Sequence, residues 1–169
     1  SRWAPLALLL AGILQSATFA PWGLWPLQVL TVAALALAVS RAGPRRAAGL
    51  GWCFGFGWLA SGWWWLYISL HDFDGMNPVL SAAAVLLLAA LLALYLALAM
   101  ALYARLCGRN PLVNGLLFAA CWLAAELARA QCFTGFPWIA AGYAHTDGPM
   151  AALAPWLGVY GIGAAVALL

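Results

Sequence analysis

Residues 79–106 read VLSAAAVLLLAALLALYLALAMALYARL, and nearly every position is Ala or Leu. About 20 consecutive apolar residues cross the ~30 Å hydrocarbon core of a bilayer as an α-helix. The run exceeds that length, and its only charged residue, Arg105, lies at its end. The stretch therefore predicts a transmembrane helix and assigns the chain to the all-α integral membrane class.

The rest of the chain has the same character. Hydrophobic residues make up 67% of it and charged residues only 7%, whereas a soluble domain is roughly 25% charged. A chain so poor in charge cannot cover its surface with polar groups, so we expect its solvent to be lipid. The net charge of +3 comes from arginine alone, without any lysine. No basic run interleaved with aromatic residues is present, which argues against nucleic-acid binding.

Turn and loop residues divide the apolar sequence into about six spans. Pro and Gly mark the first break, at 20–23, and polar residues mark the one at 71–78. The segment 131–149 is predicted to be the longest non-helical stretch. The prediction is a polytopic helical bundle with spans at 4–19, 24–40, 47–70, 79–106, 112–130 and 150–169. The chain begins at Ser1 rather than Met and stops at Leu169 inside an apolar run, so we expect both ends to be cut from a longer protein.

The charges indicate an orientation in the membrane. With the N-terminus in the cytoplasm, the inside loops hold Arg2, Arg41, Arg45, Arg46, Arg105 and Arg109, and the outside loops hold Asp72, Asp74 and Asp147. Only Arg129 breaks the pattern. Because cytoplasmic loops are enriched in arginine and lysine, the prediction is a cytoplasmic N-terminus.

Glu126 and Arg129 form the clearest polar constellation. Their i, i+3 spacing places them on one helix face, where they can pair. Ionisable groups near a membrane span are costly. One interpretation is a structural ion pair that closes the outer end of the fifth helix. The other is a polar site beneath the outer surface, with Arg129 touching a phospholipid headgroup.

The segment 133–138, FTGFPW, follows that helix. Gly135 can adopt backbone angles that other residues cannot, and Pro137 prevents helix continuation and favours an extended Phe136. We expect a fixed loop that presents Phe136 and Trp138 at the outer interface. These aromatic side chains suit an interfacial belt, and the alternative interpretation is a gate for acyl chains.

Two other polar clusters and the four cysteines are weaker candidates for a metal or catalytic site. His71, Asp72 and Asp74 lack a further ligand at helical spacing, whereas zinc needs three or four well-placed ligands. We predict no metal site, and we interpret His145 with Asp147 as a solvated turn. Cysteines at 53, 107, 121 and 132 have no C-x-x-C spacing and are interpreted as packing residues.

The third span contains a G-x-x-x-G motif at Gly51 and Gly55, followed by Gly57, Ser61 and Gly62. Small residues allow neighbouring helices to approach closely. The motif predicts tight packing of this helix inside the bundle and carries no chemistry.

A set of short motifs, in order along nearly the whole chain, resembles the bacterial apolipoprotein N-acyltransferase family. The pattern most specific to this family is a Glu-x-x-Arg motif at 126–129 followed by a Thr-Gly-Phe-Pro-Trp motif at 134–138. The further motifs are FAP (19–21), WP (25–26), GFG (55–57), WLYIS (65–69), FDGM (73–76), GY (142–143), DGP (147–149), LAP (153–155) and GVYG (158–161).

The resemblance implies an inner-membrane enzyme that completes lipoprotein maturation, with its active face in the periplasm. Such enzymes combine a transmembrane bundle with a periplasmic nitrilase-type domain inserted before the last helix. A cysteine of a Glu-Lys-Cys triad in that domain takes an acyl chain from a phospholipid as a thioester. It then transfers the chain to the α-amino group of a diacylglyceryl-cysteine lipoprotein. The implied partners are these two lipid substrates, with a monomer as the default and no cofactor.

This sequence departs from the family pattern because it ends, after residue 169, before the nitrilase-type domain. It contains no lysine, so no Glu-Lys-Cys triad can form within it and no residue is assigned as catalytic. We expect this part alone to be inactive, anchoring the catalytic domain and shaping lipid access. The resemblance makes Trp138 the first candidate for a lipid-proximal residue, with Phe136, Pro137, Arg129 and Glu126 beside it.

Two other classes of function stay open at this point. A transporter or channel fragment would carry polar residues in several spans, whereas only Glu126 and Arg129 come close. The chain could also serve as a non-catalytic membrane scaffold.

Overall fold

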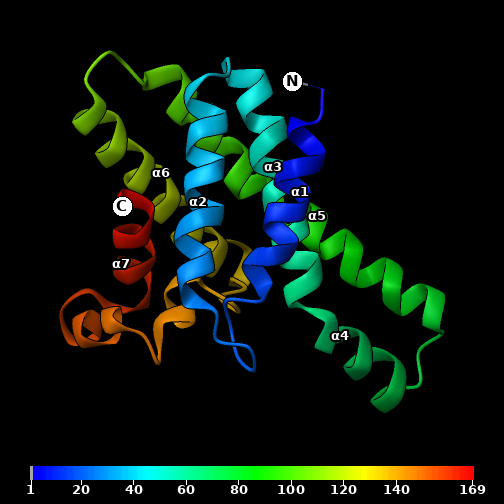
Figure 1. Ribbon diagram of the computed structural model, residues 1–169. Helices are drawn as coiled ribbons and strands as arrows, with labels where there is room; N and C mark the ends of the chain where they lie inside the picture. The colour runs from blue at the N-terminus through cyan, green and yellow to red at the C-terminus, as the bar shows by residue number, and fades with distance from the viewer. Residues whose placement is uncertain (1) are drawn as a thin grey trace.

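The computed structural model describes residues 2–169, and within them all regular secondary structure is helical (Figure 1). Most of the longer helices carry a proline in their first turn. Backbone N–H groups form no hydrogen bond within the helix at that position, so a proline, which lacks the N–H, costs no hydrogen bond there. The α-helices are α1 (Ala4–Ser16), α2 (Trp25–Ser40), α3 (Pro44–Gly62), α4 (Trp64–Ile68), α5 (Pro78–Leu106), α6 (Pro111–Gln131) and α7 (Ala154–Leu168). Shorter turns are the π-helical η1 (Ser69–Phe73) and the 3₁₀ turns η2 (Cys132–Thr134), η3 (Ala141–His145) and η4 (Pro149–Leu153).

Within the described residues, three helical segments are long and apolar enough to cross a membrane. They are Pro78–Leu106, Pro111–Thr134 and Pro149–Leu168. The helices α1 and α2 are also apolar but shorter. The predicted class, a helical membrane protein, agrees with this architecture, and the number of six crossings stays a prediction.

Helix α3 lies between α1 and α5, and its glycines make both contacts possible. A Cβ on Gly57 would collide with the backbone carbonyl of Leu9 in α1. A Cβ on Gly51 would lie 2.7 Å from Cγ of Met100 in α5. Because only glycine leaves room for these approaches, the predicted tight packing of this helix is confirmed.

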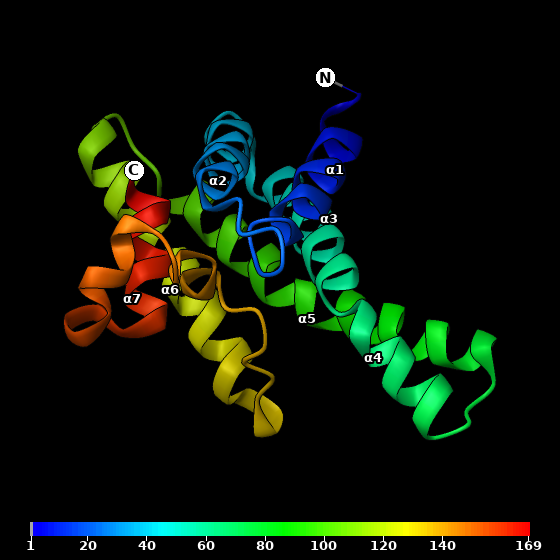
Figure 2. The same ribbon diagram turned by 60° about the horizontal axis from the view of Figure 1, so that its bottom comes forward.

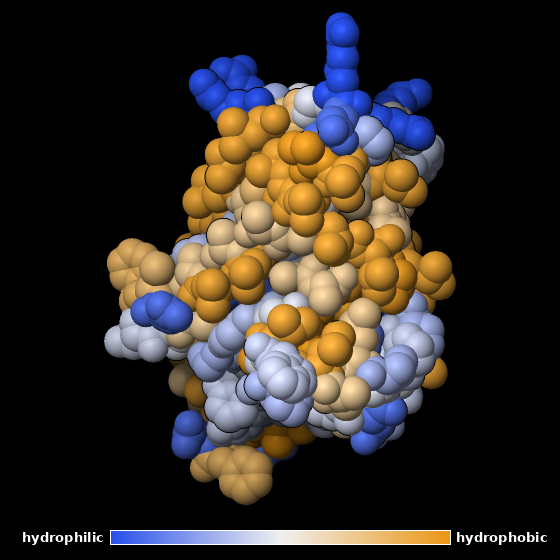
Figure 3. Space-filling view, turned by 90° about the vertical axis from the view of Figure 1, so that its left-hand side faces the viewer, coloured by the Kyte–Doolittle hydropathy of each residue, from blue (hydrophilic) through white to orange (hydrophobic). Residues whose placement is uncertain are grey.

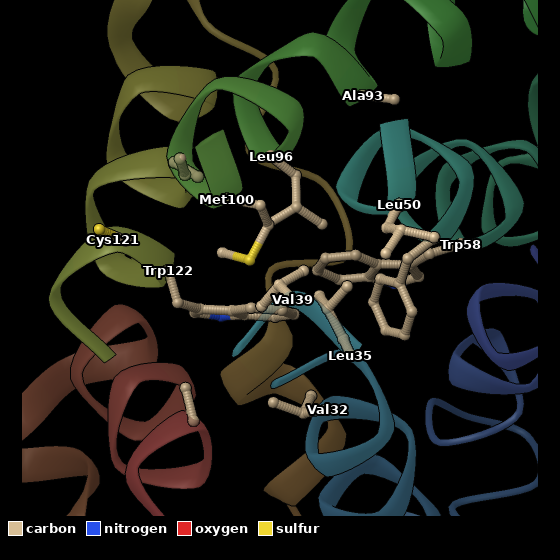
Figure 4. Close-up of a cluster of buried hydrophobic side chains, with 14 of the residues drawn as sticks. Val32, Leu35, Val39, Leu50, Trp58, Ala93, Leu96, Met100, Cys121 and Trp122 are labelled. Atoms are coloured by element: carbon tan, nitrogen blue, oxygen red, sulfur yellow. The ribbon is translucent and has the colours of Figure 1, made fainter. Parts of the chain in front are cut away.

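The core forms where α2, α3, α5 and α6 meet (Figure 4). Trp58 of α3 and Trp122 of α6 stack with ring centroids 5.7 Å apart. Phe54 packs edge-on against both rings. These large rings join helices that are distant in sequence and fix the position of α6, which carries the polar pair.

The predicted span over 47–70 is divided between several helical segments in the structure. Helix α3 ends at Gly62, and Trp63 leaves helical geometry with φ −103° and ψ 22°. Trp63 is fully buried, so its packing fixes the break. The chain continues as α4 and η1, which lie beside the first half of α5 as an arm projecting from the bundle (Figures 1 and 2).

The last span is also less regular than predicted. It begins with the 3₁₀ turn η4, and Gly158 interrupts α7 with φ 63°. That positive φ is accessible to glycine without the steric cost that other residues meet. The C-terminal part of α7 therefore changes direction and packs against α6 and α2.

Candidate functional site

Glu126 and Arg129 lie on one face of α6, at the end nearest the loop that follows it. Both side chains are buried, with 3% and 4% of their surface exposed. Arg129 Nη2 lies 3.7 Å from Glu126 Oε1. That separation allows electrostatic attraction but exceeds a normal hydrogen bond. The carboxylate of Glu126 and the guanidinium of Arg129 form their hydrogen bonds with other partners.

Arg129 binds the backbone of the loop after α6. Its Nη1 donates to the carbonyl oxygens of Phe136 at 2.9 Å and Trp138 at 2.8 Å. The Phe136 amide in turn donates to the Arg129 carbonyl at 2.8 Å. The guanidinium carbon also lies 5.7 Å from the centre of the Trp58 ring, within cation–π range. A single side chain therefore sets the path of residues 136–138.

Glu126 binds the next part of the same loop. Its Oε1 accepts a hydrogen bond from the Ala141 amide at 2.7 Å, and its Oε2 accepts one from Trp122 Nε1 at 3.1 Å. Helix α7 covers the carboxylate at Gly163, where a Cβ would lie 2.7 Å from Oε2. The glycine leaves room for the charged group against the α7 backbone.

Gln28 of α2 reaches the loop from the opposite side. Its Nε2 donates to the Ala141 carbonyl at 3.0 Å, and His145 Nε2 lies 2.7 Å from its Oε1. Because an amide oxygen only accepts, His145 carries its proton on Nε2. The network continues through α2 and α1, where the Thr31 hydroxyl bonds to Gln15 Oε1. We name the four side chains of Gln28, Glu126, Arg129 and His145 the loop clamp.

The interpretation of His145 as part of a solvated turn is wrong. Its side chain is 1% exposed and packs against the Trp25 ring at 5.7 Å. Burial lowers the pKa of His145 below its ordinary value of 6.5, because desolvation disfavours the charged imidazolium. Asp147, in contrast, is exposed as expected.

Gln28 was not predicted as a site residue, although its polarity within an apolar helix could have indicated it. Gln15, Gln28 and Thr31 are polar residues inside apolar helices, and all three are buried. A polar residue within a membrane helix usually faces a partner in the bundle. That rule selects these positions, but it does not identify the partners of Gln28, which lie in a loop more than a hundred residues away.

The clamped backbone presents the aromatic side chains in two directions. The Phe136 ring packs edge-on against Trp63, with centroids 4.7 Å apart. The Trp138 ring lies 5.5 Å from Trp65 and is 56% exposed. Pro137 between them is also exposed. Gly135 adopts the expected positive φ, 76°, and Trp138 is exposed as expected, whereas Phe136 is half-buried and packs against the core.

Two apolar grooves adjoin this loop. The first, of about 550 Å³, runs between α5 and η2 and is lined by Leu91, Leu94, Tyr95, Leu98, Phe133 and Phe136 among others. The second, of about 460 Å³, is lined by Phe19, Pro137, Trp138, Ile139 and Tyr143. Phe136 and Trp138 therefore each form a wall of a different groove.

The polar turn at 71–74 is separate from the clamp. His71 Nε2 lies 3.9 Å from Asp72 Oδ1, and both side chains are partly exposed. Across residues 2–169, no group of three His, Cys, Asp or Glu side chains is arranged to hold a metal ion.

Comparison with known proteins identifies the family. Residues 11–169 match the model of the apolipoprotein N-acyltransferase N-terminal domain. The chain is 51% identical over 170 residues to an apolipoprotein N-acyltransferase of Verminephrobacter eiseniae, with 95% of the chain and 32% of that protein covered. It is 49% identical to one of Ralstonia nicotianae, with 98% and 32% covered, and 44% identical to one of Pseudomonas putida, with 96% and 33% covered. The chain thus spans about a third of the length of these relatives. It belongs to the apolipoprotein N-acyltransferase family and contains the N-terminal domain of that family.

Proposed function

We propose that this chain is the membrane part of an enzyme that N-acylates lipoproteins in the bacterial inner membrane. The reaction transfers an acyl chain from a phospholipid to the free amino group of an N-terminal diacylglyceryl-cysteine. The names of the relatives support an acyltransferase acting on apolipoproteins. The apolar helices support a membrane location.

The proposed topology has about six crossings, with the N-terminus in the cytoplasm and the loop clamp on the periplasmic side. The charge distribution supports it. Helix α2 places Arg41 at one end, whereas its other end, at Trp25, contacts the loop that contains His145. Figure 3 shows hydrophilic residues gathered at the end of the molecule that carries the N-terminus, above a broad apolar surface. Arginine-rich ends face the cytoplasm.

In this proposal the chemistry belongs to a nitrilase-type domain that follows residue 169 in the whole protein. The chain itself contains no lysine for a Glu-Lys-Cys triad. Its role is to anchor that domain and to guide lipids toward it.

One observation carries this role: Arg129 fixes the backbone of a loop whose side chains line two apolar grooves. Grooves of this size and lining suit acyl chains. Phe136, Pro137 and Trp138 are then lipid-proximal, and Arg129 with Glu126 are positioning residues that act through them.

The test is Trp138→Ala in the full-length enzyme, with Trp156→Ala as the matched control. Arg129 donates its hydrogen bond to the backbone carbonyl of Trp138 and not to the side chain. The substitution therefore removes part of the groove wall and leaves the clamp intact. Trp156 is 86% exposed on α7 and does not line either groove. We expect acyl transfer to fall about tenfold in the first variant, the equivalent of roughly 1.4 kcal/mol of lost contact. The control should keep its activity. Equal activity in both variants at normal membrane insertion would reduce Trp138 to an interfacial belt residue.

A further inference from the structure

We propose that a small cavity beside the loop clamp binds one buried water molecule, and that this water is a further hydrogen-bond partner of Arg129. The cavity has a volume of about 20 Å³ and lies where α3, α5 and α6 meet. Its walls include Trp58, Tyr95, Ala125, Glu126 and Arg129. A polar cavity holds one water molecule once its volume reaches roughly 10–15 Å³. The cavity therefore has room for a single water and excludes a larger ligand.

Two buried donors belong to side chains that line this cavity, and neither has a hydrogen-bond acceptor within residues 2–169. They are Nη2 of Arg129 and Nε1 of Trp58, in residues that are 4% and 3% exposed. The other terminal nitrogen of Arg129, Nη1, already donates to two carbonyls of the loop. Buried polar groups in native proteins nearly always have a protein or water partner. Two such donors beside one cavity therefore require an acceptor inside it.

Glu126 provides the acceptor for the hydrogen atoms of the water itself. Its two oxygens take one hydrogen bond each from the Ala141 amide and Trp122 Nε1, whereas a carboxylate has about four acceptor sites. Arg129 Nη2 lies 3.7 Å from Glu126 Oε1, and water commonly bridges polar groups that are too far apart for a direct bond. A water bound to Trp58, Arg129 and Glu126 forms three hydrogen bonds, the usual number for a buried water.

The charges around the cavity favour a neutral occupant over an anion. Glu126 balances the charge of Arg129, so the pair offers no net positive charge. The cavity also shares the side chains of Leu92 and Tyr95 with the first groove, so the water lies behind one wall of that groove. Arg129 fixes the path of residues 136–138. The water therefore supports, through Arg129, the loop that lines the groove.

Radiolytic footprinting of the full-length enzyme in detergent micelles tests this site. X-ray pulses convert water into hydroxyl radicals, which oxidise the side chains next to each water. The oxidation rate of Trp58 is compared with that of Phe54, a fully buried neighbour that does not line the cavity. Each rate is divided by the rate of the same residue in denatured protein. We expect Trp58 to be oxidised faster than Phe54 on this scale, although solvent reaches neither ring.

A pair of matched variants connects that signal with the cavity. Ala125→Val adds two methyl groups to the cavity wall, and Ala119→Val makes the same change elsewhere on α6. The two alanines are similarly buried, at 7% and 8% exposure, and Ala119 does not line the cavity. In Ala125→Val, oxidation of Trp58 should fall to the level of Phe54. In Ala119→Val, it should stay at the level of the unaltered enzyme.

A structure of the unaltered enzyme at a resolution that shows ordered waters is the second arm. We expect one isolated density peak within hydrogen-bond distance of Trp58 Nε1, Arg129 Nη2 and Glu126. The lack of a peak, or density continuous with a lipid in the first groove, would overturn the proposal. Equal rates for Trp58 and Phe54 in the unaltered enzyme would do the same, even if Ala125→Val folds poorly. Because no acyl transfer is measured, these outcomes are independent of the proposed activity.

Discussion

The side chains of Gln28 and Glu126 bind the backbone of the same residue, Ala141, from opposite sides. Glu126 accepts the amide proton at 2.7 Å, and Gln28 donates to the carbonyl at 3.0 Å. One side chain comes from α2 and the other from α6, so the loop between them ties these two helices together. Because the loop is held by buried polar groups, we expect its stability to depend on a few specific atoms.

Replacing Glu126 with Gln should destabilise the bundle. A carboxylate accepts from both Trp122 and Ala141, whereas an amide presents one oxygen and one NH₂ to these two donors. The change also leaves Arg129 buried without its counter-charge. Breaking a buried pair in this way costs about 3 kcal/mol of unfolding free energy, which equilibrium unfolding in mixed detergent micelles measures. Asp72→Asn is the control, because that side chain is 56% exposed and surface changes stay within about 0.5 kcal/mol. Similar losses in both variants would contradict a structural role for Glu126.

Replacing Gly163 with Ala should also disturb the clamp. The new methyl group would lie 2.7 Å from Glu126 Oε2 and 3.2 Å from Ala141 Cβ, so the carboxylate or the loop must move. Overpacking of this kind typically costs about 1–3 kcal/mol. Gly49→Ala is the matched helical control, because nothing lies within 4 Å of its added Cβ. It should leave stability unchanged or raise it by up to about 1 kcal/mol. Thermal unfolding of the two variants in the same detergent separates these outcomes, and equal melting temperatures would refute the prediction.

The pH dependence of stability should reveal His145. Its pKa in the folded protein is lowered by burial from the ordinary 6.5, so the unfolded chain binds the proton more readily. The contribution of neutral His145 to the free energy of unfolding is therefore complete above pH 6.5. It is lost as the pH falls from 6.5 through the lowered pKa of His145 in the folded protein. Unfolding curves between pH 7.5 and pH 5 test this, and His145→Gln should flatten the acid side of the profile relative to His71→Gln. An identical profile in the His145 variant would show that another group titrates.

The sequence was sufficient for the features that depend on local pattern. The Ala/Leu run at 79–106 predicted α5 to within a residue. The glycines of α3 predicted its close packing, and Gly135 with Pro137 predicted a fixed loop. Each of these rests on neighbours in the chain or on the geometry of one residue type.

The features that the sequence did not predict depend on distant contacts. The break after Gly62 follows from burial of Trp63 against Phe136, which arrives from another part of the chain. The pairing of Gln28 with His145 likewise joins two segments that no local pattern connects. A solvated turn and a buried clamp contain the same residue types, and only the packing of α2 against η3 distinguishes them.

Hydrogen exchange of the loop amides is the most direct test of the clamp. Peptides covering 136–145 include the Phe136 and Ala141 amides, which donate to Arg129 and Glu126. Peptides from the core of α5, at 89–100, serve as an internal reference. In Gln28→Leu and Glu126→Gln, we predict that exchange in 136–145 accelerates more than exchange in 89–100, because global destabilisation affects both regions and loss of the clamp adds local opening of the loop. Unchanged protection of 136–145 in both variants would contradict the clamp.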